Sequence, residues 1–254
     1  MIRVGTVFAL CFLCAGMAAA QVAEDADPEF RDVQQARAAL QQEDTELNRT
    51  MLAMALLTHG NDFYRQFKVS GISEDLKQAL RHVEEASVLA PEAAPVWQLA
   101  SSIYYDQRHV PEFALEALNA FVMLEKFASD DLSGRVLHID FLMEREDWLG
   151  SLRVAERTFM AAPDFAIATL LDRMVFAYLR AGKPWQGIHF FRPYMDLHPA
   201  VQLSTAILFR RVGDDETAQS LMDQIRFDSR ATPELRQTLR QLEAHWTEAG
   251  VIDD

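Results

Sequence analysis

The chain has 254 residues, of which 38 are acidic and 24 are basic, so its formal net charge is −14. A chain of this charge repels nucleic acids and anionic lipid surfaces, and neither is expected as a partner. The two cysteines, Cys11 and Cys14, both lie within residues 1–20. The rest of the chain therefore cannot form disulfides, thiolate metal sites, attached haem or a cysteine nucleophile.

Residues 1–20 are typical of a secretory signal peptide. Arg3 is their only charged residue, an apolar stretch follows, and Ala18-Ala19-Ala20 precedes Gln21. This arrangement predicts export followed by cleavage. The apolar stretch is shorter than the roughly 20 residues of a membrane-spanning helix, so an uncleaved anchor is the weaker alternative. We expect no stable membrane insertion after cleavage.

Beyond residue 20, apolar residues recur at helical spacing, and no stretch alternates as a strand does. Gly182 and Gly213, each followed closely by Pro or Asp, indicate a helix end and a new helix start. Ser73 and Asp147 are expected N-caps. The apolar stripes begin at Leu76, Ala114, Trp148, Leu171, Ile188 and Ala218. The chain is thus predicted to be a run of helical hairpins.

The prolines indicate a longer period. Pro163 and Pro199 are 36 residues apart, and Pro91 precedes Pro163 by twice that distance. A two-helix unit of this length resembles the tetratricopeptide (TPR) repeat. The second helix of a TPR unit carries a small residue, a large apolar residue four later, a small residue three later and a proline five beyond. Two stretches have this spacing, Ala79-Val83-Ala86-Pro91 and, with a bulky residue in the third place, Gly187-Phe191-Tyr194-Pro199.

The resemblance implies an all-α fold, an α-solenoid of about five TPR-like hairpins with a C-terminal capping helix. The first hairpin, which is poorly formed in sequence, is expected around Gly60-Asn61. Thr232 is the expected N-cap of the closing helix, with Pro233 at its first position. A closed bundle or a less regular helical array is the alternative. The expected divisions are a signal peptide (1–20), an acidic segment with N-terminal helix material (21–59), the TPR-like array (60–231), and the capping helix with an acidic tail (232–254).

The sequence contains none of the common catalytic signatures. It has no nucleotide-binding glycine loop, no nucleophile elbow and no zinc-protease motif. His138 and His189 have apolar neighbours on expected helices, so they are interpreted as packed residues rather than ligands. The aromatic stretch Trp185–Tyr194 is interpreted as core packing rather than a ligand box. We expect no enzymatic activity, no metal and no cofactor.

Stacked TPR units leave a concave groove lined by their first helices. This lining is acidic with aromatic patches, and it lacks the Lys, Asn and Arg set with which TPR clamps bind acidic C-termini. It suits a protein or peptide segment that carries basic and apolar groups, although ordinary solvated acids are the alternative. By resemblance, the groove residues are Gln98, Tyr105, Asp106, Asp140, Glu144, Asp172 and Phe176.

The favoured function is a non-catalytic protein-interaction or assembly module of a bacterial-type cell envelope. The expected location is the periplasm, with secretion as the second choice. Two alternatives belong to other classes: a helical-repeat enzyme that acts on glycans or cell-wall material, and a sensor subunit that binds a small ligand or a metal.

The leader gives the first testable prediction. When the full chain is expressed in a Gram-negative host, we expect the periplasmic fraction to contain protein that starts at Gln21, because small residues occupy the cleavage site. Intact-mass measurement and N-terminal sequencing check this. Recovery of a protein that retains residues 1–20 would contradict it.

Overall fold

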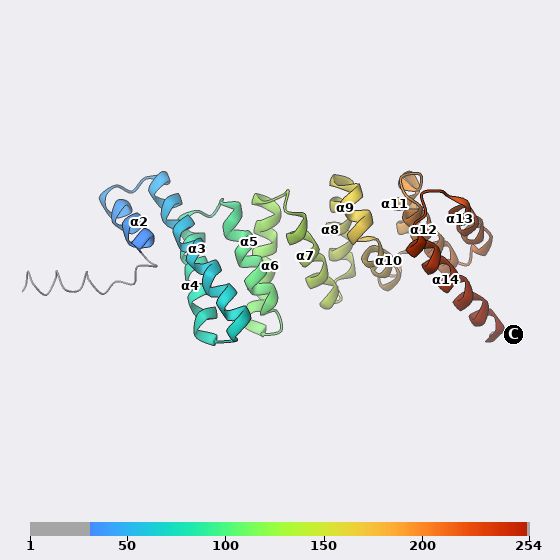
Figure 1. Cartoon of the computed structure of the whole chain (residues 1–254), viewed down its shortest axis with the longest axis horizontal. Coiled ribbons are helices and arrows are strands. Elements are labelled where there is room, and N and C mark those ends of the chain that lie inside the picture. Colours follow the sequence, from blue (N-terminus) through green and yellow to red (C-terminus); the bar gives the residue numbers. More distant parts are fainter. Residues whose placement is uncertain (1–30, 253–254) are drawn as a thin grey trace, which may run out of the picture. The chain divides into compact units, whose positions relative to one another are not determined.

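The structure, a computed structural model, describes residues 31–252, with side chains described as far as Trp246. These residues form thirteen α-helices and one short 3-10 turn without any strand (Figure 1). They have the all-α solenoid architecture predicted from the sequence, and they divide into two compact units that part between Tyr104 and Tyr105. The predicted signal peptide and its cleavage site lie outside the described residues.

Across residues 31–252, no helix combines the length and the apolarity that a bilayer crossing requires.

The first unit begins with a short helix that packs on a long hairpin. Val33 and Ala36 of α2 are buried, and Asp32 accepts a hydrogen bond of 2.7 Å from His59 of α3. The helix α4 begins at Ser73 with Ile72 in the cap position and no side-chain cap, so the N-cap expected at Ser73 is wrong. The helices are α2 (Arg31–Gln42), α3 (Glu46–Ser70), α4 (Ser73–Leu89) and α5 (Ala94–Asp106), whose last two residues belong to the second unit.

The break expected at Gly60-Asn61 does not exist. The helix α3 continues through Gly60 and ends at Gly71, which has a φ of 70°. A Cβ atom at Gly60 would lie only 3.2 Å from the Cβ atom of His82 on α4. The glycine therefore permits close packing of two helices and does not end one. The boundary expected between residues 59 and 60 falls inside α3, and the first hairpin is α3 and α4.

The second unit contains three complete hairpins, α7/α8, α10/α11 and α12/α13, each made of helices that contact one another. Two helices, α9 and α10, follow Pro163 and meet at Leu170. The elements are α6 (Pro111–Phe127), α7 (Leu132–Glu144), α8 (Trp148–Ala161), α9 (Pro163–Thr169), α10 (Leu171–Arg180), α11 (Pro184–Phe191), η2 (Arg192–Tyr194), α12 (Pro199–Arg211), α13 (Asp215–Phe227) and α14 (Pro233–Ile252).

The turn within each of these three hairpins contains one residue with a left-handed backbone conformation. Gly182 and Gly213 have φ values of 66° and 82°, and Glu146 takes the same left-handed conformation in α7/α8 with a φ of 59°. The predicted cap Asp147 accepts a hydrogen bond from the Gly150 N–H. Thr232 likewise accepts one from the Leu235 N–H, which confirms the predicted start of the closing helix.

The helices α10, α11 and α12 pack closely in the core of the second unit. Tyr178 and Phe191 are fully buried, with their rings edge to face at 6.0 Å. A Cβ atom at Gly187 would lie 2.7 Å from the Tyr178 ring and 2.6 Å from Leu208. The small residue that the TPR pattern requires at this position is thus explained by the space available.

Gly187→Ala should lower the free energy of unfolding by about 1–3 kcal/mol, because the added methyl group overpacks a rigid aromatic contact. Thermal and urea unfolding, followed by circular dichroism, measure this. Gln186→Ala is the matched control, since Gln186 is exposed on the same helix and its loss should change little. Equal stability of the two variants would contradict the packing argument.

Candidate protein-binding groove

The predicted groove residues fall into both units. Gln98 lies in the first unit, where it lines a small pocket of about 540 Å³ between α3 and α5. Within this pocket the Tyr64 hydroxyl donates a hydrogen bond of 3.2 Å to the Ser102 carbonyl oxygen, which ties α3 to α5. The other six predicted residues belong to the second unit.

Glu144 and Tyr105 are covered by an arginine that sequence reasoning missed. The Arg108 guanidinium donates hydrogen bonds to both carboxylate oxygens of Glu144, one of them 2.7 Å long. Its carbon lies 4.1 Å from the centre of the Tyr105 ring. Burial raises the pKa of Tyr105, an effect to which the neighbouring carboxylates add. The Tyr105 ring is therefore half-buried, with the Arg108 guanidinium over one face.

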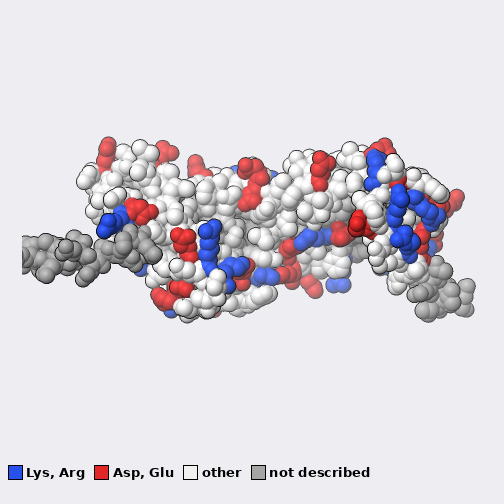
Figure 2. Space-filling model, in the orientation of Figure 1, with Lys and Arg blue, Asp and Glu red and all other residues white. Residues whose placement is uncertain are grey.

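Asp140 is held in the same way. Arg173 donates to both of its carboxylate oxygens, with the shorter hydrogen bond at 2.6 Å, and also to the Thr169 carbonyl oxygen. Around the middle of the face drawn in Figure 2, acidic and basic side chains accordingly adjoin one another. The sequence predicted an acidic lining. At Asp140 and Glu144 the structure pairs each carboxylate with an arginine, which neutralises its charge.

The sequence did contain a signal for these two pairs. Arg108 and Glu144 are 36 residues apart, and Asp140 and Arg173 are 33 residues apart. Both separations are close to one repeat. Since neighbouring units stack side by side, residues one repeat apart lie next to each other, and opposite charges at that spacing predict an ion pair.

A larger groove opens between α7, α9, α10, α12 and α14, with a volume of about 1010 Å³. Its walls are mostly apolar and include Val136, Leu171, Leu203, Ile207 and Leu235. The closing helix therefore forms one wall of the groove, in addition to covering the end of the stack. Only Asp172 of the predicted site residues lines this groove.

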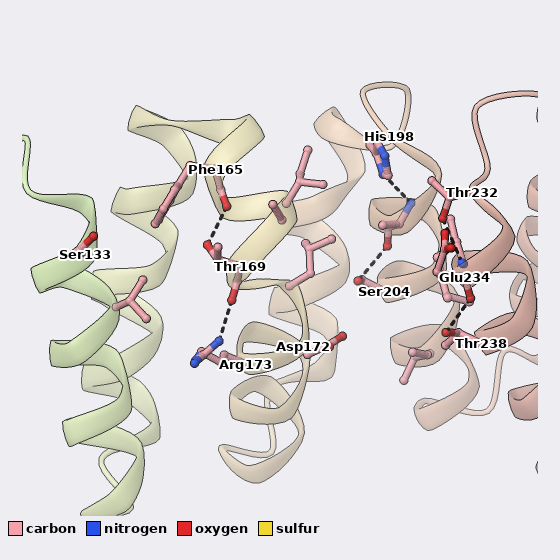
Figure 3. A pocket seen from close by; sticks show the side chains of 18 of the residues that line it. Ser133, Phe165, Thr169, Asp172, Arg173, His198, Ser204, Thr232, Glu234 and Thr238 are labelled. Atoms are coloured by element: carbon pink, nitrogen blue, oxygen red, sulfur yellow. Dashed lines mark hydrogen bonds between the residues drawn. The ribbon is translucent and has the colours of Figure 1, made fainter.

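Asp172 contributes a negatively charged carboxylate to this groove. In Figure 3 its carboxylate points from α10 into the space on the side of α14. It has no ion-pair partner within the described residues, and it is exposed. Glu234 lines the groove from α14, whereas the arginine in the lining, Arg173, is already bound to Asp140. The groove thus presents apolar surface together with carboxylates that an incoming cation can pair with.

The two remaining predicted residues lie outside this lining. Phe176 is 48% exposed, with its ring edge against Trp148 at 5.6 Å and the Arg180 guanidinium 5.9 Å from its centre. Asp106 is half-buried in the last turn of α5. Of the six predicted residues in the second unit, Tyr105 and Glu144 adjoin Arg108, Asp140 pairs with Arg173, and Asp172 alone lines the groove.

His138, His198 and part of the aromatic stretch pack or cap within the fold, whereas His189 is exposed and Trp185 is 53% exposed. His138 is buried, with Nδ1 at 2.7 Å from Glu125. His198 caps α12 by accepting a hydrogen bond from the Ala200 N–H. Phe190 and Tyr194 pack against the buried Phe159. Within residues 31–246, no three His, Cys, Asp or Glu side chains converge as metal ligands.

Comparison with known proteins locates the fold but not the function. No protein-family model matches the chain, and no curated protein matches it. A chain from the structure of Naa15/Naa10 bound to HypK-THB is similar, with 16% identity, a TM-score of 0.50, and coverage of 92% of this chain and 34% of that chain. This chain therefore spans about a third of the length of that protein. The fold is a TPR-like helical repeat.

Two TPR proteins align at lower scores. YrrB, described as a TPR protein with an unusual peptide-binding site, has 14% identity and a TM-score of 0.44, over 74% of this chain and 89% of its own. A TPR protein from Parabacteroides merdae has 11% identity and a TM-score of 0.34, over 82% of this chain and 90% of its own.

The Arg108–Glu144 pair should make stability depend on pH. The hydrogen bonds from Arg108 hold the pKa of Glu144 below its usual range. The pair therefore stabilises the fold fully above the pKa of an unfolded glutamate, roughly 4.3. That contribution is lost as the pH falls through the lower folded-state pKa. Glu144→Gln should flatten the fall in unfolding midpoint temperature below about pH 4.5, by a small amount because Glu144 is exposed and screened by solvent.

Differential scanning fluorimetry at roughly pH 7 to pH 3 measures the unfolding midpoint of both proteins, because carboxylates titrate within this range. Glu116→Gln is the control, because Glu116 is exposed and has no ion pair within the described residues. A Glu144→Gln profile parallel to that of the wild type would show that the pair contributes nothing.

Proposed function

We propose that this chain is a non-catalytic protein-interaction or assembly module of a bacterial-type cell envelope, and that its α7–α14 groove binds a protein or peptide segment. The observation that carries the proposal is the groove itself, a largely apolar space of about 1010 Å³ on a TPR-like scaffold. Such scaffolds bury one face of each helix and leave extended surfaces available for binding.

The charges of the groove support a partner with basic and apolar groups. Asp172 and Glu234 line it, while its arginine is paired with Asp140. A lysine or arginine of the partner would complete an ion pair with Asp172, and apolar side chains would cover Val136, Ile207 and Leu235. Electrostatic complementarity of this kind sets specificity and association rate.

A periplasmic location is part of the proposal. It is supported by the signal-like residues 1–20, by the absence of cysteine after Cys14, and by the excess of arginine over lysine. A turnover screen on glycans and cell-wall fragments separates this proposal from the alternative of a helical-repeat enzyme, which requires product formation.

The groove can be tested with a random peptide library displayed on phage and selected against the mature protein. Selected peptides should combine basic and apolar residues, and their affinity should fall as salt screens the charges. Asp172→Lys should weaken binding by about tenfold or more, which corresponds to ~1.4 kcal/mol. The reason is that the substitution replaces an attraction by a repulsion.

Asp130→Lys is the control, because Asp130 is exposed in the turn after α6 and does not line the groove. It makes the same change of net charge and should leave affinity within about twofold of wild type. If Asp172→Lys binds the selected peptides as tightly as the wild type does, the groove is not the binding site.

A further inference from the structure

A second groove lies between α6, α7 and α8 and shares no residue with the first. Its volume is about 580 Å³. Leu118 and Val122 of α6 line one side, Met160 of α8 lines the other, and His138 of α7 contributes to the lining. The proposed function does not use this surface.

The rim of this groove exposes large apolar side chains. Leu118, Val122 and Met160 are 40%, 54% and 57% exposed. Leu118 and Val122 are four residues apart on one helix, so they form a stripe, while Ala117, Phe121 and Leu124 of the same helix are buried in the core. The helix α6 is therefore apolar on two faces, and the stack covers only one of them. Contiguous exposed apolar surface of this kind marks interaction sites.

The lining of the groove is rigid before any partner arrives. Glu125 receives hydrogen bonds through both carboxylate oxygens, Oε1 with His138 Nδ1 at 2.7 Å and Oε2 with Arg157 at 2.6 Å. The His138 ring stacks on Phe121 at 4.8 Å. Burial alone would raise the pKa of Glu125, but His138 and Arg157 outweigh it and hold that pKa below its usual range. A preorganised surface of this kind loses little conformational freedom on binding.

One cationic group in this groove has no ion-pair partner within the described residues. Each lining carboxylate accepts a hydrogen bond within the fold: Glu125 as described, Asp147 from the Gly150 N–H at the cap of α8, and Glu156 from the Tyr178 hydroxyl at 2.6 Å. Asp147 and Glu156 keep their negative charge, because these two donors are neutral. Arg153 of α8 lines the groove, is exposed, and has no ion pair within the described residues. Arg153 is therefore the cation of this groove with which a carboxylate of a ligand can pair.

We propose that the α6–α8 groove is a second docking site, which binds an amphipathic helical segment of a partner protein. Apolar side chains of that segment, spaced four residues apart, pack between Leu118, Val122 and Met160, and an adjacent Asp or Glu pairs with Arg153. A helix matches this surface because the apolar stripe repeats at helical spacing, and the described residues offer no strand edge for an extended segment. The Arg153 guanidinium favours a segment that carries a carboxylate beside its apolar stripe, whereas Asp172 of the α7–α14 groove favours a cation.

Two designed peptides test the proposal. Both are alanine-based helices of about 18 residues with leucines at helical spacing; one carries flanking glutamates and the other lysines. By fluorescence anisotropy, the glutamate peptide should bind the full mature protein at least about tenfold more tightly than the lysine peptide. Arg153→Glu should reverse this preference. Val122→Asp and Met160→Ser should each weaken binding of the glutamate peptide.

Phe227→Asp is the matched control, because Phe227 is 83% exposed at the end of α13 and does not line this groove. It should leave binding unchanged, as should Asp172→Lys, which affects only the α7–α14 groove. Circular dichroism and unfolding midpoints check that each variant is folded. If Val122→Asp does not fold, Met160→Ser still tests the groove. Equal binding of both peptides, no binding of either, or the same loss in Phe227→Asp as in Val122→Asp would overturn the proposal.

Discussion

Every helix of this chain has an apolar face that only neighbouring helices can cover. Both cysteines lie within residues 1–20, so no disulfide holds the helices together, and the described residues contain no sheet. Cohesion depends on how closely helices approach, as at Gly187, where α11 packs directly on the Tyr178 ring of α10. Small residues at such contacts are as necessary as large ones, since a single added methyl group has no space.

The same stacking decides the electrostatics of the binding surface. Because residues about one repeat apart become neighbours, Arg108 reaches Glu144 and Arg173 reaches Asp140. The negative charges of Glu144 and Asp140 are thereby neutralised. Asp172 keeps a carboxylate without an ion pair within the described residues. Specificity in this groove therefore depends on a few unmatched groups and not on the large net negative charge of the chain.

The second unit contains two surfaces whose unmatched charges have opposite sign. Asp172 lines the groove built largely from first helices, and Arg153 lines the one between α6 and α8. Both are flanked by apolar side chains that the stack leaves exposed or half-buried. If both proposed sites bind, the module would hold two partner segments at once, as the proposed assembly role requires.

The sequence by itself determined the helical periodicity, the repeat length, the capping residues Asp147 and Thr232, and the turn positions of Gly182 and Gly213. These features are local, because they depend on backbone conformation and on which face of a helix is apolar. Tertiary structure alone decided that Gly60 lies within a helix, since a glycine that permits close packing and one that ends a helix look alike in sequence. It also decided which acids remain unpaired, because a carboxylate's partner comes from the neighbouring repeat and depends on side-chain geometry that no single helix contains.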